Sequence, residues 1–188
     1  MNNLPSREEA YDLFTQYNES ESLIKHGLTV EGIMEHFATL FEGEDTKVWG
    51  IIGLIHDIDY EKYPEEHCIK GKEILEEARW PLEAIRAMQS HGYEICTDVK
   101  PETHLEKVLY TIDELSGLIT ATALMRPSRS VSDLTVKSVM KKWKTKSFAA
   151  GVNRELILKG TQTLDMTIQE VIEECIIGMR KISDSIGL

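Results

Sequence analysis

The sequence predicts an all-α fold, a helical bundle that forms one domain over residues 1–188. Apolar residues recur at the three- and four-residue spacing of amphipathic helices, and helix-capping residues precede several of these segments. No two-residue hairpin turn is evident, and no run of alternating apolar and polar residues is long enough to require a strand. With 188 residues and 41% hydrophobic content, the chain is long enough to bury a substantial core.

The first half of the chain gives clear helical signals. Ser6 and Glu9 form a capping box before the first helix, and a second helix is expected over residues 22–37. Asp45 can cap a third helix, which contains the most apolar stretch of the chain, residues 49–55. Because this stretch is apolar on all sides, we expect its helix to be buried.

The later helices follow from the same spacing and from the position of a proline. Residues 67–75 are amphipathic, Pro81 suits the first turn of a helix over residues 81–91, and a long helix is expected over residues 105–119. Toward the C-terminus, helices are expected at residues 133–144, 153–159 and 167–182. The apolar side of the last helix either closes the bundle or forms a contact in a homodimer, and the sequence leaves both alternatives open.

Four side chains with metal-binding chemistry fall on faces that point inward. His56 and Asp57 end the most apolar stretch, where an unpaired carboxylate would cost on the order of several kcal/mol. At about 100° per residue, His26 falls on the apolar stripe of its own helix, and Asp113 falls on that of the helix over residues 105–119. Two imidazoles and two carboxylates suit a divalent cation such as Mn, Fe, Co, Ni, Zn or Mg. The sequence therefore predicts a metal site made by three helices.

The order of these residues resembles that of the HD superfamily of metal-dependent hydrolases. The resemblance is carried by Leu-Ile-His-Asp-Ile around His56 and by Tyr-Thr-Ile-Asp-Glu-Leu around Asp113, and it covers a metal-site core of about residues 22–124. The C-terminal helical extension, about residues 127–188, matches no general motif of the superfamily. Many members read His-Asp-Ile-Gly-Lys where this chain has His-Asp-Ile-Asp-Tyr, so a role assigned to that lysine does not transfer.

The resemblance also suggests a second metal ion. His67 and His91 correspond to two further histidines with which some HD branches hold a second ion, with Asp57 bridging the two ions. The alternative is that they are a helix-start histidine and a helix-end histidine, the latter stabilised by the helix dipole. His36 and His104 are expected to face solvent, because neither shares the inward face of the neighbouring candidate ligand on its helix.

The resemblance implies hydrolysis of a small phosphoester by a metal-activated water, with nucleotides among the candidate substrates. No side chain is identified as the catalytic acid. Asp59 and Glu61, just after the metal pair, are candidates to protonate a leaving group, with surface acids on a turn as the alternative. Two other functions stay open: a di-iron oxygenase of the HD type, and a nucleotide-sensing module without turnover.

Charge is distributed unevenly along the chain. The net charge of −11 argues against general nucleic-acid binding, but residues 126–159 contain nine Lys or Arg against two acids, a local charge of +7. Lys146 and Arg154 in this island are candidates to bind a substrate phosphate, because a phosphoryl group beside a metal still has anionic oxygens to neutralise. The alternative is one solvated helix face.

The three cysteines are an odd number with no close pair in the sequence, which argues against a disulfide framework and a zinc knuckle. We expect Cys68, Cys96 and Cys175 to be reduced, half-buried residues. The N-terminus lacks the apolar run of a signal peptide, and no stretch approaches the roughly 18 apolar residues of a membrane span. A cytoplasmic location without membrane contact is therefore expected.

Overall fold

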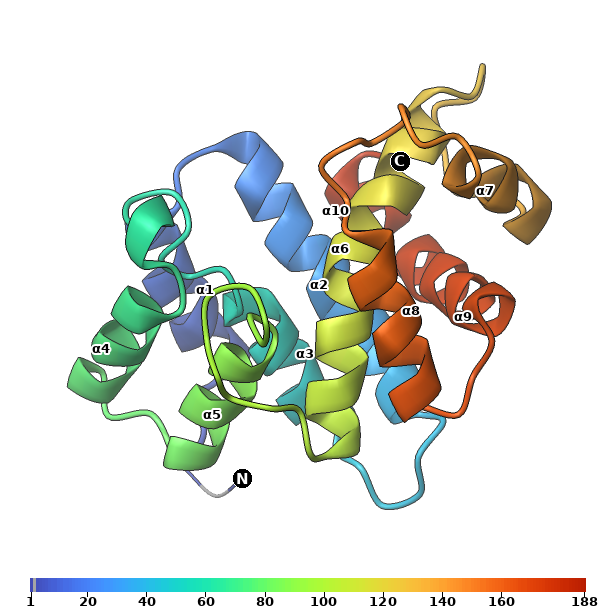
Figure 1. The fold of residues 1–188 in the computed structure, drawn as a ribbon. Helices are drawn as coiled ribbons and strands as arrows, with labels where there is room; N and C mark the ends of the chain where they lie inside the picture. Colours follow the sequence, from blue (N-terminus) through green and yellow to red (C-terminus); the bar gives the residue numbers. More distant parts are fainter. Residues whose placement is uncertain (2) are drawn as a thin grey trace.

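A computed structural model describes residue 1 and residues 3–188, and in this part of the chain it contains ten α-helices, one short 3-10 helix and no strand. The prediction of an all-α fold is confirmed. The helices are α1 Arg7–Tyr17, α2 Glu21–Ala38, α3 Thr46–Ile55, η1 Pro64–Glu66, α4 Ile69–Glu77, α5 Leu82–Ser90, α6 His104–Leu124, α7 Val136–Trp143, α8 Arg154–Thr163, α9 Ile168–Lys181 and α10 Ser183–Ile186. Figure 1 shows α2 and α6 at the centre, with α4 and α5 on one side and α7 and α9 on the other.

Side-chain caps fix where several helices begin. Capping boxes are formed at Ser6, Thr103 and Thr167, and the Asp45 carboxylate accepts hydrogen bonds from two backbone N–H groups at the start of α3. Each such cap contributes about 1 kcal/mol to helix stability. The predicted caps at Ser6 and Asp45 are confirmed, and Pro81 lies at the N-cap of α5, one residue outside the turn where it was expected.

Helices α2 and α3 lie close together because α3 presents glycines to α2. A Cβ atom on Gly53 would lie 2.9 Å from Met34 Cγ and 3.0 Å from the carbonyl oxygen of Val30. A Cβ atom on Gly50 would lie 2.6 Å from Glu35 Cγ. Side chains at these positions would separate the helices, so the glycines bring the C-terminal end of α3 toward α2.

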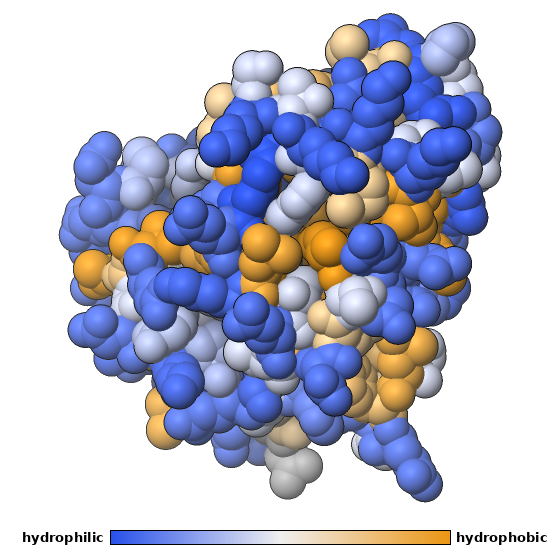
Figure 2. Space-filling view, turned by 45° about the vertical axis from the view of Figure 1, so that its right-hand side comes forward, coloured by the Kyte–Doolittle hydropathy of each residue, from blue (hydrophilic) through white to orange (hydrophobic). Residues whose placement is uncertain are grey.

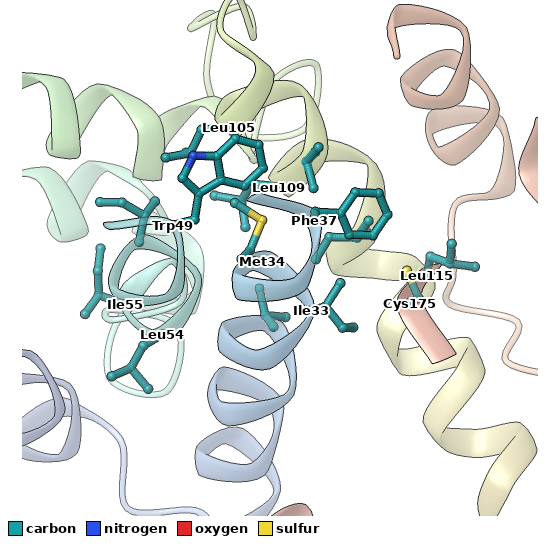
Figure 3. Packing of buried hydrophobic residues seen from close by; sticks show 14 of the residues in the cluster. Ile33, Met34, Phe37, Trp49, Leu54, Ile55, Leu105, Leu109, Leu115 and Cys175 are labelled. Atoms are coloured by element: carbon teal, nitrogen blue, oxygen red, sulfur yellow. The ribbon is translucent and has the colours of Figure 1, made fainter. Parts of the chain in front are cut away.

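The main core lies between α2, α3, α6 and α9 (Figure 3). Ile33, Met34 and Phe37 of α2 and Trp49 of α3 are fully buried there. From α9 the buried apolar side chains are those of Val171, Ile172, Cys175, Ile176 and Met179. The apolar side of α9 therefore packs inside the chain and closes the bundle, one of the two alternatives that the sequence left open.

One histidine differs from the prediction of solvent exposure. His36 is buried, with its Nε2 atom 2.6 Å from Glu174 Oε2 and its Nδ1 atom 2.8 Å from the Lys181 ammonium. Helix α9 covers this face of α2, which the spacing within α2 alone does not reveal. His104 is exposed as predicted, and its ring stacks on Phe41 with the centroids 4.4 Å apart.

Charged residues make up 28% of the chain. Figure 2 shows one face, on which hydrophobic side chains gather in a band across the middle of an otherwise hydrophilic surface. Among the described residues, no helix combines the length and the apolar composition needed to cross a bilayer.

Candidate metal centre

Helices α2, α3 and α6 bring the four predicted ligands together. His26 lies in α2, His56 and Asp57 follow the last residue of α3, and Asp113 lies in the middle of α6. His26 Nε2 is 3.0 Å from Asp113 Oδ1 and 3.2 Å from His56 Nε2. Asp57 Oδ2 is 3.4 Å from His56 Nε2 and 3.5 Å from His26 Nε2. We call these four residues the first ligand set.

His67 and His91 form a second ligand set with Asp57. Asp57 Oδ1 is 3.4 Å from His67 Nε2 and 3.5 Å from His91 Nε2, and the two imidazole nitrogens are 3.0 Å apart. The two oxygens of Asp57 therefore face different sets, as a bridging carboxylate would require. Both histidines do lie beside helix ends, as the alternative interpretation held, but their rings also point into the site.

All four imidazole rings of the two sets have a protein oxygen beside Nδ1. The partners are the Gly53 carbonyl for His56 (2.7 Å), the Asp59 carboxylate for His67 (2.7 Å), the Met88 carbonyl for His91 and the Ser116 hydroxyl for His26 (3.5 Å). Carbonyl and carboxylate oxygens only accept hydrogen bonds, so in three of the rings Nδ1 carries the hydrogen. The Nε2 atoms of these rings then point into the site, which is the orientation typical of metal-bound histidines.

The donor atoms fit divalent cations. Two neutral imidazole lone pairs that face each other at 3.0 Å repel unless a positive charge lies between them. Two nitrogens bound to one tetrahedral ion at about 2.0–2.1 Å lie about 3.3 Å apart, which is close to the 3.0 and 3.2 Å separations in the two sets. Imidazole and carboxylate together suit Mn, Fe, Co, Ni or Zn, and the carboxylates alone also suit Mg.

The electrostatics of the first ligand set also favour positive charge. Burial by itself would raise the pKa of Asp57, but His56 and the neighbouring imidazoles outweigh it and hold that pKa well below its usual range. Asp113 behaves in the same way: burial raises its pKa, and His56 and His26 lower it further than burial raises it. Burial lowers the pKa of His56, yet the two carboxylates raise it well above its usual value. Both carboxylates therefore stay ionised and available to a cation.

Asp59 and Glu61 do not reach the open part of the site. Asp59 is fully buried, with Oδ1 accepting a hydrogen bond from His67 Nδ1 and Oδ2 accepting one from the Gly71 N–H at 2.6 Å. It is neither a surface acid nor placed to protonate a leaving group, and it instead orients His67. Glu61 accepts hydrogen bonds from two backbone N–H groups just before α2, at 2.7 and 3.0 Å. Both candidates were assigned from proximity in sequence, which does not determine the direction of a side chain.

A cavity of about 410 Å³ opens onto both ligand sets. Five of the six candidate ligands line it, whereas His56 is fully buried below them. A Cβ atom on Gly117 would meet no atom of a neighbouring element within 4 Å, so this position of α6 leaves the cavity open. The cavity leaves one side of the site accessible to a small molecule, and the fully buried His56 lies on the side away from it.

The two predicted phosphate-binding residues do not line this cavity. The Arg154 guanidinium donates hydrogen bonds to four backbone carbonyls between residues 143 and 152, at 2.6 to 3.3 Å. Its donors hold the loop before α8 in shape, and Gly151 and Val152 of that loop reach the cavity wall. Lys146 is exposed on the same loop. Arg154 was assigned from local charge, but its contacts are structural.

Three further residues, not predicted from the sequence, lie in or beside the site. The Asn18 side-chain amide is buried and donates hydrogen bonds to the carbonyls of Ile58 at 3.0 Å and Asp57 at 3.4 Å, so it holds the turn after α3. Ser116 contacts His26, and Glu114 lines the cavity. Glu114 was visible as the acidic neighbour of Asp113 in the sequence, whereas Asn18 lies 39 residues from the turn that it holds.

Two cysteines also lie beside the second ligand set. The Cys68 and Cys96 sulfurs are 3.3 Å apart, although 28 residues separate them, and Cys68 Sγ is 3.8 Å from His91 Nε2. Together with His67 they form a group that could hold a metal ion. All three cysteines are free, as predicted, but this pair is close in space where the sequence showed no close pair.

Comparisons of the chain with protein-family models, with curated proteins and with solved structures found no match.

Proposed function

We propose that this protein is a metal-dependent hydrolase that cleaves a small phosphoester, with nucleotides among the candidate substrates, and that it binds one or two divalent ions per chain. The observation that carries the proposal is the pair of ligand sets that share Asp57 on the wall of an accessible cavity. The order of the ligands along the chain and the all-helical fold add support, since both resemble the HD superfamily.

Each candidate ligand has a defined role in this proposal. A bound divalent cation would activate a water for attack and would polarise a phosphoryl oxygen. His26, His56 and Asp113 hold the first position together with Asp57, while His67 and His91 hold the second. Asp59 keeps the Nε2 lone pair of His67 directed into the site through its contact with Nδ1.

The test begins with elemental analysis of the protein as purified, followed by assays of nucleotide and sugar phosphates with Mn, Co, Ni or Mg. Asp57→Asn should lose both ions, and Asp113→Asn should lose the first ion. Each should lose more activity than the roughly 10- to 100-fold that removal of a hydrogen-bond partner of a ligand typically costs. Asp98→Asn is a matched control, because Asp98 is exposed and does not line the cavity.

Circular dichroism of each variant separates loss of a ligand from loss of the fold. A folded Asp57→Asn or Asp113→Asn variant that keeps its metal content and its full activity would reject this site. Replacement of His67 by Gln should halve the metal content if two ions are bound, and an unchanged content would favour a single ion.

The second ligand set keeps one other activity open. A bridging carboxylate between two histidine-containing positions is also what a di-iron oxygenase of the HD type requires. Protein from an iron-replete host would then be coloured and would consume oxygen with its substrate, whereas a phosphohydrolase would release phosphate without oxygen. A protein that binds nucleotide tightly but performs neither reaction would be the sensing module.

A further inference from the structure

We propose that the cavity selects a phosphoester whose body beyond a single phosphoryl group carries no negative charge, with Glu114 as the residue that disfavours a second anionic group. This inference rests on the proposed function, because it assigns the phosphoryl group to the two ligand sets. It concerns the remaining space of the cavity, where the rest of a substrate would lie.

The walls around this space are mainly apolar. Leu23, Ile95 and Val152 contribute hydrocarbon, and Tyr60 adds a phenol ring that makes edge-on contact with His67. Tyr60 and Ile95 are both partly exposed at the surface, as expected of side chains that meet a ligand at a cavity mouth. The volume of about 410 Å³ lies at the lower end of the roughly 300–1,000 Å³ typical of small-molecule sites.

The residues that line the cavity include no lysine and no arginine. The arginine of the adjoining loop, Arg154, directs its guanidinium to backbone carbonyls. Lys25, next to His26 in sequence, lines an adjoining cavity that shares His26 and Gly117 with this one, and its ammonium pairs with Glu21 at 2.7 Å. Sites for di- and triphosphates normally supply Arg or Lys to the additional phosphates. Among the described residues that line this cavity no side chain supplies a permanent positive charge, so cations at the ligand sets would supply the charge that faces a phosphoryl group.

Glu114 makes a second anionic group still less favourable. Its carboxylate lies in the cavity wall beside Asp113, and Oε2 accepts a hydrogen bond from the Asn153 N–H at 3.2 Å. That bond fixes the carboxylate between α6 and the loop before α8. A neutral or positively charged group on the substrate meets an acceptor there, whereas an anionic group meets a like charge.

The test uses three non-hydrolysable probes that share a phosphonate and a ring and differ in one charge. They are phenylphosphonate, 4-carboxyphenylphosphonate and 4-(aminomethyl)phenylphosphonate, and calorimetry measures their binding to the Mn-loaded protein. The carboxylate should weaken binding by on the order of tenfold, since a like charge facing Glu114 costs about 1.4 kcal/mol or more. The aminomethyl group should bind at least as tightly as the unsubstituted ring.

Glu114→Gln keeps an oxygen that can accept from Asn153 and removes the charge, so it should abolish most of the difference between the carboxyl and unsubstituted probes. Glu155→Gln is the matched control and should leave the difference intact, because Glu155 is exposed on α8 and does not line the cavity. Equal binding of the three probes to the wild-type protein, or an unchanged ratio in Glu114→Gln, overturns the charge selection alone. Failure of every probe to bind the metal-loaded protein overturns the phosphoester site as well.

Discussion

Asp59 provides a sharp test of how the second ligand set is organised, because it touches no substrate space and acts through His67. In Asp59→Asn a single amide oxygen must replace two carboxylate oxygens, which accept from His67 Nδ1 at 2.7 Å and from the Gly71 N–H at 2.6 Å. If the amide oxygen stays with Gly71, its NH₂ group faces Nδ1 and drives the imidazole hydrogen to Nε2. If it turns to His67, a buried N–H is left without an acceptor.

Either outcome weakens the second metal position. Loss of a hydrogen-bond partner of a histidine ligand typically costs 10- to 100-fold in metal affinity, so we expect a loss of about 1.4 to 2.7 kcal/mol. The first ligand set does not contact Asp59 and should keep its affinity. The second set should therefore lose its ion on dialysis while the first set retains one.

The assay is calorimetric titration of the metal-free protein with Co or Zn, combined with elemental analysis after dialysis. Asp98→Asn is the control for the substitution itself, because that carboxylate is exposed. Two binding steps in Asp59→Asn with unchanged affinities would refute the role assigned to this carboxylate. Equal weakening of both steps would show that the variant perturbs the whole site.

Four further predictions concern stability. Gly160→Ala should destabilise the fold by about 1 to 3 kcal/mol, because the new Cβ would lie 3.0 Å from the Thr111 Cα and would force α8 away from α6. Gly117→Ala should stabilise the fold by up to about 1 kcal/mol through helix propensity, because the new Cβ would meet no neighbouring element within 4 Å. Urea unfolding measures both changes. Burial, and then the charge of Glu31, raise the pKa of Glu35 above its ordinary value of 4.5, so the ionised form is disfavoured in the folded state. Glu35→Gln should therefore raise Tm at neutral pH, and this gain should disappear as the pH falls below 4.5; a pH-independent change in Tm would contradict it. A divalent metal at about 100 times its Kd should raise the free energy of unfolding by about 2.7 kcal/mol, which corresponds to roughly 5 to 10 °C in Tm. A chelator should reverse this gain. An unchanged Tm would argue against metal binding to the native state.

Helical periodicity was sufficient to predict the first ligand set. Each of His26 and Asp113 shares a face with apolar residues one turn away, and in a bundle such a face points to the common core. His56 and Asp57 are close in space because they are adjacent in sequence, and they follow a helix that is buried from Trp49 to Ile55. Periodicity predicts which side chains of a helix point inward, and the shared hydrophobic core then brings the inward faces of different helices together.

The interpretations that the structure corrected depend on packing between helices. His36 lies off the inward face defined within α2, but α9 covers its side of the helix and supplies Glu174 and Lys181 as partners. Arg154 carries a charge that suits phosphate, yet the loop before α8 folds around its guanidinium. In both cases the partners are backbone groups or residues of another helix, and a single sequence does not reveal such contacts.

The position of two ligands has a local explanation in the chemistry of helix ends. His56 and His91 are both C-cap residues, and the Nδ1 atom of each lies beside the carbonyl oxygen three residues earlier, that of Gly53 or Met88. Carbonyls in the last turn of a helix lack an intrahelical partner, so they are free to accept an imidazole N–H. The same hydrogen bond satisfies the helix end, fixes the tautomer and directs Nε2 away from the helix axis. A histidine at the end of a buried helix is therefore preorganised as a ligand before any distant residue joins it, whereas His67 depends on a carboxylate eight residues away.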